Sequence, residues 1–292
     1  VYVRKEVVDE VEDVYSQILP SDAKKYDSKA QVGDFVEIHL DTNQFGRIVA
    51  QTAKHVIRQG IREAERGQMM EEFQSRQQEL VTAVVQRVDP KTGAVTVEIG
   101  KAGAVLPRSE QLENDEFQEG DHIKVFIVDV KDTGKGPRAM ISRTHPGLVK
   151  RLFELEVPEI YSGEIEIKAI SREAGSRTKL AVYSKDENLD AVGSCIGQRG
   201  ARVNKIVEEL GGEKIDIVKY SDNPEEFIAE ALSPAEVVSV EIVSAENRSC
   251  RVSVPDEQLS LAIGNKGQNA RLAARLTGWK IDILPASGFY GE

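Results

Sequence analysis

The sequence contains one five-residue pattern twice, and this repeat constrains the fold more than any other feature. The first copy is Ile196–Gly200 and the second is Ile263–Gly267, each reading Ile-Gly-x-x-Gly. A short β pattern follows both copies, because Lys214–Val218 and Lys280–Leu284 both begin with Lys-Ile-Asp-Ile. The two copies lie 67 residues apart. A repeat of this length predicts a duplicated structural module.

The glycines in each copy suit a loop that approaches a phosphate chain. A glycine has no Cβ, so the backbone can come close to a sugar-phosphate. When such a loop precedes a helix, the free N–H groups of the first turn point toward the anion. A single Gly-x-x-Gly is more often a simple turn at a helix start, but duplication with matching flanks favours binding. Both modules resemble KH domains, whose loop clamps about four nucleotides.

Basic side chains surround both loops although the chain as a whole is acidic. It has 38 Lys and Arg residues against 49 Asp and Glu residues, a net charge of −11. Residues 197–207 and 264–281 contain no acid. A local basic cluster in an acidic chain indicates a surface for an anionic polymer. We expect RNA to contact Ile196, Gly197, Gln198, Arg199, Gly200, Arg202, Lys205, Ile263, Gly264, Asn265, Lys266, Gly267, Arg271 and Arg275.

Residues 1–78 combine a short β region with the longest helical pattern of the chain. Val1–Arg4 reads like the middle of a strand, and residues 34–40 form a second strand pattern. Apolar residues then recur at i, i+3 and i+4 from Phe45 to Ile61, and polar residues dominate from Arg62 onward. We predict a partial N-terminal α/β domain with a connector helix that is buried where it starts and solvated where it ends.

Residues 79–143 change to the period of β-strands. Five short β runs separated by turns predict a small Greek-key barrel of the OB type, and their order resembles an S1 domain. The runs lack the surface aromatics on which an RNA-binding barrel stacks bases. Phe117, His122 and Phe126 are the candidates, either as stacking platforms or as core residues.

Residues 144–220 and 221–287 are the two repeated modules, followed by a tail at 288–292. Each reads as helix–strand–strand–helix–helix–strand, the order of a bacterial (type II) KH domain. The complete chain is therefore predicted to be a multidomain α+β protein with an S1 barrel and two tandem KH domains.

Three stretches carry a closer resemblance. Phe45–Lys54, Ile61–Arg66 and Asp256–Gly264 resemble the NusA family of bacterial transcription termination and antitermination factors, as does the order of the modules. The resemblance implies a cytoplasmic, monomeric, RNA-binding elongation factor. Its partners would be single-stranded nascent RNA, RNA polymerase and other antitermination factors, and it would modulate pausing, termination and antitermination. The alternative is a KH/S1 accessory module of an RNA-processing or ribosome-associated complex.

The sequence argues against an enzyme and against a resident cofactor. It contains neither a Walker A motif nor His-Glu-x-x-His, and its four histidines are scattered. Cys195 and Cys250 follow no metal-ligand spacing, so we expect them to be reduced, packed thiols. No stretch approaches the about 20 apolar residues of a membrane span.

Overall fold

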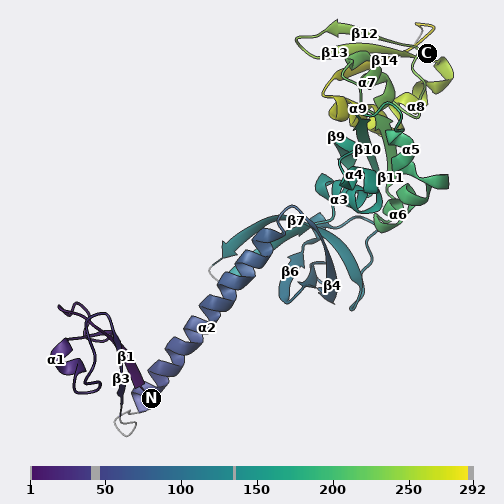
Figure 1. Ribbon diagram of the computed structural model, residues 1–292. Coiled ribbons are helices and arrows are strands. Elements are labelled where there is room, and N and C mark those ends of the chain that lie inside the picture. Colours follow the sequence, from purple (N-terminus) through teal and green to yellow (C-terminus); the bar gives the residue numbers. More distant parts are fainter. Residues whose placement is uncertain (1, 41–46, 134–135, 289–292) are drawn as a thin grey trace. The chain divides into compact units, whose positions relative to one another are not determined.

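The computed structural model describes residues 2–40, 47–133 and 136–288. The chain divides into two compact units, Val1–Gly67 and Gln68–Glu292 (Figure 1). Among the sequence predictions, Phe45 at the helix start and residues 289–292 of the tail lie outside the described residues.

The first unit contains a small three-stranded sheet. Strand β1 (Tyr2–Val7) pairs with β2 (Gln17–Ile18) in parallel and with β3 (Phe35–His39) in antiparallel orientation. The short helix α1 (Pro20–Ala23) lies between β2 and β3 in the sequence. Its small core consists of Val7, Ala23, Ala30 and Val36. The strand predicted at 34–40 is confirmed.

Helix α2 (Arg47–Ser75) is 29 residues long and continuous through both of its glycines. The prediction about its burial is wrong. Val56 and Ile57, on the face expected to be buried, are each 61% exposed. The end expected to be solvated carries Phe73, which is 2% exposed and packs with Met69 in the core of the barrel. Two apolar residues four positions apart share one face of a helix, so this pair is enough to anchor its last turns.

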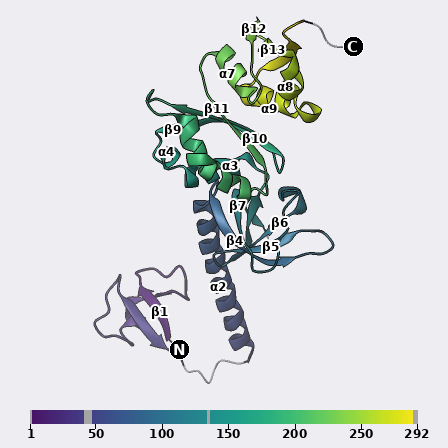
Figure 2. The same cartoon turned by 90° about the vertical axis from the view of Figure 1, so that its right-hand side faces the viewer.

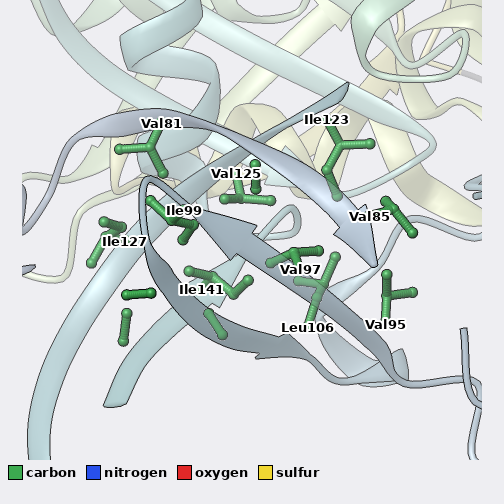
Figure 3. Packing of buried hydrophobic residues seen from close by; sticks show 14 of the residues in the cluster. Val81, Val85, Val95, Val97, Ile99, Leu106, Ile123, Val125, Ile127 and Ile141 are labelled. Atoms are coloured by element: carbon green, nitrogen blue, oxygen red, sulfur yellow. The ribbon is translucent and has the colours of Figure 1, made fainter. Parts of the chain in front are cut away.

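Four residues separate the barrel from α2. Its strands are β4 (Leu80–Val88), β5 (Val95–Ile99), β6 (Ala102–Leu106), β7 (His122–Thr133) and β8 (Gly136–Ser142). They close in the order β4-β5-β6-β8-β7, with β6 and β8 joined through the pair Val105 and Met140. Alternate side chains such as Val95, Val97 and Ile99 point inward and fill the barrel (Figure 3). The predicted OB-type barrel is confirmed.

Each repeated module folds as a three-stranded sheet covered by helices (Figure 2). We call them KH1 and KH2. KH1 contains α3 (Pro146–Glu156), α4 (Pro158–Tyr161), β9 (Ile165–Glu173), β10 (Arg177–Ser184), α5 (Ala191–Ile196), α6 (Ala201–Glu209) and β11 (Lys214–Lys219). KH2 contains α7 (Pro224–Ala231), β12 (Ser239–Ser244), β13 (Ser249–Val254), α8 (Leu259–Ile263), α9 (Gln268–Thr277) and β14 (Lys280–Pro285). In both modules the last strand runs parallel to the middle one.

The sheet of KH1 has apolar side chains on both faces. Leu180 and Val182 pack with the helices of KH1, whereas Ala181 and Val218 belong to the core of KH2. At this junction the buried Lys179 Nζ donates to the carbonyl of Ser233 over 2.5 Å and to Asp216 over 3.0 Å. The two KH modules therefore share a core and are fixed against each other.

A buried arginine connects the barrel to KH1. Arg143 is 3% exposed and forms two bonds to Asp115, at 2.8 and 3.1 Å. It also donates to the Glu209 carbonyl at 2.8 Å, and its guanidinium lies 5.6 Å from the Phe117 ring. Phe126 is buried in the core of KH1 and stacks on His145. Of the three aromatic candidates for base stacking, Phe126 is thus packed inside the protein, and Phe117 is partly buried against the barrel core.

Candidate nucleic-acid interface

The two Gly-x-x-Gly loops have the same backbone conformation. Gly197 and Gly264 have φ/ψ values of 75°/172° and 76°/173°. Two residues later, Arg199 (54°/28°) and Lys266 (51°/30°) are both in the left-handed region that non-glycine residues seldom occupy. Gly200 and Gly267 follow with φ values of 79° and 75°. The sequence repeat therefore corresponds to one loop structure built twice.

The two glycines of the KH2 loop serve different purposes. A Cβ on Gly264 would lie 2.8 Å from the backbone nitrogen of Asn269, and one on Gly197 would lie 2.8 Å from Cγ of Arg202. The first glycine is therefore needed for packing. In contrast, a Cβ on Gly267 would have no atom within 4 Å. The second glycine of the KH2 loop thus faces open space, where a ligand backbone can approach.

Each loop also presents the start of a helix without a side-chain cap. Gly200 and Gly267 occupy the N-cap positions of α6 and α9, and neither helix has a capping side chain. The N–H groups of Ala201 and Gln268, the first residues of the two helices, donate to the carbonyls of Gln198 and Asn265. No side chain caps the following N–H groups of the first turn, which can bind an anion. Immediately before the loops, Ile196 and Ile263 are 37% and 38% exposed, so each loop has an apolar neighbour on the surface.

Four of the predicted polar side chains lie free at the loops. Gln198, Arg199, Asn265 and Lys266 are exposed, and no hydrogen bond or ion pair is formed by their side chains among the described residues. A free guanidinium and a free ammonium group thus occupy equivalent positions in the two modules. This arrangement leaves both cations available to a phosphate group.

The other four predicted cations are paired with carboxylates. Arg202 bonds Glu159 at 3.0 Å, and Lys205 bonds Glu156 at 3.1 Å. Glu173 of β9 receives two bonds from Arg271, at 2.7 and 3.2 Å, and lies 3.7 Å from Arg275. These bonds from Arg271 are the largest cause of the lowered pKa of Glu173. The acids come from α3, α4 and β9, outside the acid-free windows of the sequence.

A cleft of about 620 Å³ lies beside the KH2 loop. Its lining includes Gly264 and Asn265 from the loop and three residues of KH1 outside the predicted site, Ser176, Arg177 and Lys214. In the sequence, Lys214 is the first residue of a repeated strand pattern. No sequence signal places it near the loop of the following module, because the packing of KH1 on KH2 brings the two together.

Within residues 2–40, 47–133 and 136–288, no group of three or more His, Cys, Asp or Glu side chains is arranged to hold a metal ion. In the same ranges, no helix has the length and apolar character needed to cross a membrane. Both cysteines are free and buried, and burial raises the pKa of Cys195 to about 12 and that of Cys250 to about 11.

Comparison with protein families matches every module. Residues 1–67 match the NusA N-terminal domain, and residues 76–142 match the S1 RNA binding domain. Residues 143–220 and 224–289 match the NusA-like first and second KH domains. The chain belongs to the NusA family.

Curated relatives agree with this assignment over nearly the whole chain. The protein of Halalkalibacterium halodurans is 53% identical over 98% of this chain and 74% of its own length. That of Bacillus subtilis is 54% identical over 97% of this chain and 76% of its own. That of Thermus thermophilus is 43% identical over 97% of this chain and 72% of its own. All three are named transcription termination/antitermination protein NusA.

Proposed function

We propose that this member of the NusA family holds single-stranded nascent RNA on KH1 and KH2 while its N-terminal unit associates with RNA polymerase. In this way it modulates pausing, termination and antitermination in the cytoplasm, without a catalytic step of its own. The names of its relatives support a role in transcription. The RNA-binding domains supply the contact with the transcript.

The observation that carries the proposal is the matching pair of loops. Both have the same strained backbone, an uncapped helix start, and a free cation at the same position, Arg199 or Lys266. A KH loop clamps about four nucleotides and leaves their bases to be read in the adjoining groove. Because paired bases cannot enter such a groove, the ligand is single-stranded RNA rather than a duplex.

Loop variants test RNA binding directly. One variant replaces Gln198 and Arg199 with Asp, and the other replaces Asn265 and Lys266 with Asp. Each places carboxylates where a phosphate is expected, so each should weaken binding of an unpaired, adenine-containing oligonucleotide at least about tenfold. The readout is fluorescence anisotropy with labelled RNA.

A charge control accompanies these variants. Lys24→Asp combined with Lys29→Asp changes the net charge by a similar amount at exposed positions of the N-terminal unit. This control should bind nearly as the parent chain does. If both loop variants fold and bind like the parent chain, the assignment of the loops is wrong.

The division of labour between the two units is tested in transcription. Helix α2 runs from the first unit into the second. A flexible Gly-Ser segment inserted after Arg66 should weaken the effect on hairpin pauses while leaving oligonucleotide binding nearly unchanged. The same segment inserted after Gly288 is the control and should affect neither. Loss of RNA binding with normal pausing would contradict the proposed division.

A further inference from the structure

A groove of about 550 Å³ lies on the barrel where β6 and β8 meet. These two strands are joined through the single residue pair Val105 and Met140, whereas β8 pairs with β7 from Gly136 to Ser142. Among the described residues, positions 136–139 of β8 therefore have no partner strand on the side that faces β6. A strand edge without a partner keeps backbone groups that another polypeptide can bind.

The floor of the groove is aliphatic. It is formed by Val105 of β6, Val128 of β7 and Met140 of β8. Met140 is 44% exposed, although it is a large apolar side chain. A methionine side chain is flexible and adapts to apolar groups of different shapes. The floor therefore suits one apolar side chain of a ligand, which would cover Met140.

Two cations lie beside this floor. Lys131 of β7 and Arg138 of β8 line the groove, are exposed, and are direct partners in the ladder between the two strands. Like charges in directly opposite positions of a sheet repel each other. Neither side chain forms a hydrogen bond or an ion pair among the described residues. An anionic group between the two cations would remove this repulsion.

Acidic side chains of the barrel do not provide that group. Among the described residues that line the groove, Glu110 is the single carboxylate. It already accepts a hydrogen bond from the Thr144 hydroxyl at 2.9 Å. The groove is therefore locally basic in a chain whose net charge is −11, so its charge is complementary to an acidic ligand.

The spacing along β8 indicates the shape of this ligand. Arg138 and Met140 both point to the outer face of the barrel, because Ala139 between them belongs to the barrel core. Side chains two positions apart on a strand are separated by about 6.8 Å. An extended peptide has the same spacing. An apolar side chain over Met140 therefore places an acid two positions away beside Arg138.

RNA fits this groove less well than a peptide does. Barrels that bind single-stranded RNA stack its bases on aromatic rings. Among the described residues that line the groove, His145 has the one aromatic ring, and this ring is stacked on the buried Phe126 with centroids 4.8 Å apart. The aliphatic floor and the unpaired strand edge match the apolar side chain and the backbone of a polypeptide instead.

We propose that this groove binds an extended acidic segment of a partner protein. One apolar side chain of the segment packs on Val105, Val128 and Met140, and a carboxylate two positions away lies between Lys131 and Arg138. The groove shares no residue with the Gly-x-x-Gly loops, so this inference goes beyond the RNA binding proposed above. It gives the barrel a protein-binding role while the KH modules hold RNA.

The test measures binding of a labelled peptide to the complete chain by fluorescence anisotropy. The probe reads Gly-Phe-Ser-Glu-Ser-Glu-Gly, and a control peptide has lysine in place of both glutamates. Lys131→Ala combined with Arg138→Ala should weaken binding of the probe about two- to thirtyfold, because two ion pairs are lost. Arg87→Ala combined with Lys101→Ala removes two exposed cations of the same barrel that do not line the groove, and it should leave binding unchanged.

A charge reversal separates binding from folding. Lys131→Glu converts the like-charged pair with Arg138 into an oppositely charged pair, so the thermal midpoint should stay the same or rise. The probe should nevertheless bind at least about tenfold more weakly, because the new carboxylate takes the place of the ligand's own. Met140→Ala should weaken binding about two- to fivefold through the loss of apolar contact.

The outcomes distinguish this partner from other occupants. The proposal is wrong if the parent chain binds neither peptide or binds both equally, or if the Lys131 and Arg138 double variant binds like its control. Groove variants that lower the affinity for unpaired RNA and spare the peptide would assign the groove to RNA. Groove variants that abolish a dimer detected by light scattering would assign it to a second copy. Either result overturns the proposal.

The same peptide assay keeps this inference apart from the proposed function. The loop variants at Gln198 and Arg199 and at Asn265 and Lys266 should bind the probe as the parent chain does, since these residues lie outside the groove. Loss of peptide binding in the loop variants would contradict a separate site on the barrel. Loss of RNA binding alone leaves the groove assignment intact.

Discussion

The two glycines of the KH2 loop should respond very differently to the same substitution. Gly264→Ala places a Cβ in a conformation that is nearly exclusive to glycine (φ 76°, ψ 173°), which costs about 1–3 kcal/mol. That Cβ would also lie 2.8 Å from the backbone nitrogen of Asn269, and relieving such overpacking costs about 1–3 kcal/mol more. A gain of about 0.4–1 kcal/mol from the stiffer unfolded chain offsets part of this. We expect Gly264→Ala to lower the free energy of unfolding by about 2–5 kcal/mol in total.

Gly267→Ala should cost much less. Gly267 has an ordinary left-handed conformation (φ 75°, ψ 17°), which costs alanine about 1–2 kcal/mol before the same unfolded-state gain is subtracted. Its Cβ would meet nothing within 4 Å. The expected net loss of stability is therefore about 1 kcal/mol or less. RNA affinity should nevertheless fall, because the new methyl group occupies the open space that we assign to the ligand backbone.

Trp279 provides the assay for this comparison. It is the single tryptophan of the chain and packs against the core of KH2, so its fluorescence reports the unfolding of that module. With a urea dependence of about 1–3 kcal/mol per molar, the midpoint of Gly264→Ala should lie about 1 M below that of Gly267→Ala. If Gly267→Ala is the more destabilising variant, or binds RNA as tightly as the parent, our explanation of the two glycines is wrong.

Two further predictions concern buried groups. Arg143→Ala leaves the carboxylate of Asp115 buried without its arginine partner and should destabilise the protein by about 3–5 kcal/mol in urea unfolding. Arg251→Ala removes an exposed ion pair and should cost about 1 kcal/mol or less. Similar costs for the two variants would contradict the buried role of Arg143. Burial raises the pKa of Cys195 to about 12, above the pKa of an exposed thiol. The buried thiol therefore contributes stability below about pH 9, and this stability is lost as the pH rises toward 12. Native protein should therefore react slowly with iodoacetamide at pH 8.5, and rapid labelling of the folded protein would contradict the burial of this thiol. Between pH 9 and 11, Cys195→Ala should lose less stability than the parent chain.

The elements of the fold could be predicted because their signals are local. Gly197 and Gly264 mark loops that only glycine can form, and the alternation of Val95, Val97 and Ile99 is the signature of a half-buried strand. Helix α2 shows what local signals cannot predict. Its period identified an amphipathic face, but it carried no information about what covers that face, and Val56 and Ile57 are exposed.

The candidate site could be predicted only in part for a similar reason. Arg199 and Lys266 lie in the loops themselves, so the repeat identified them directly. Arg271 also lies in an acid-free window, but Glu173, almost a hundred residues earlier in the chain, neutralises it in the folded protein. The proximity of Lys214 to the KH2 loop could not be predicted, because it depends on how the two modules pack. Contacts between residues so far apart in the sequence cannot be predicted from any short segment of it.

Crosslinking of RNA to the complete chain, followed by peptide mapping, tests the central claim most directly. A photoreactive single-stranded RNA should crosslink to peptides that contain residues 196–200 and 263–267. A perfect hairpin of the same length should compete poorly. Crosslinks confined to the barrel or to the N-terminal unit, with neither loop labelled, would contradict the claim that the paired loops hold the RNA.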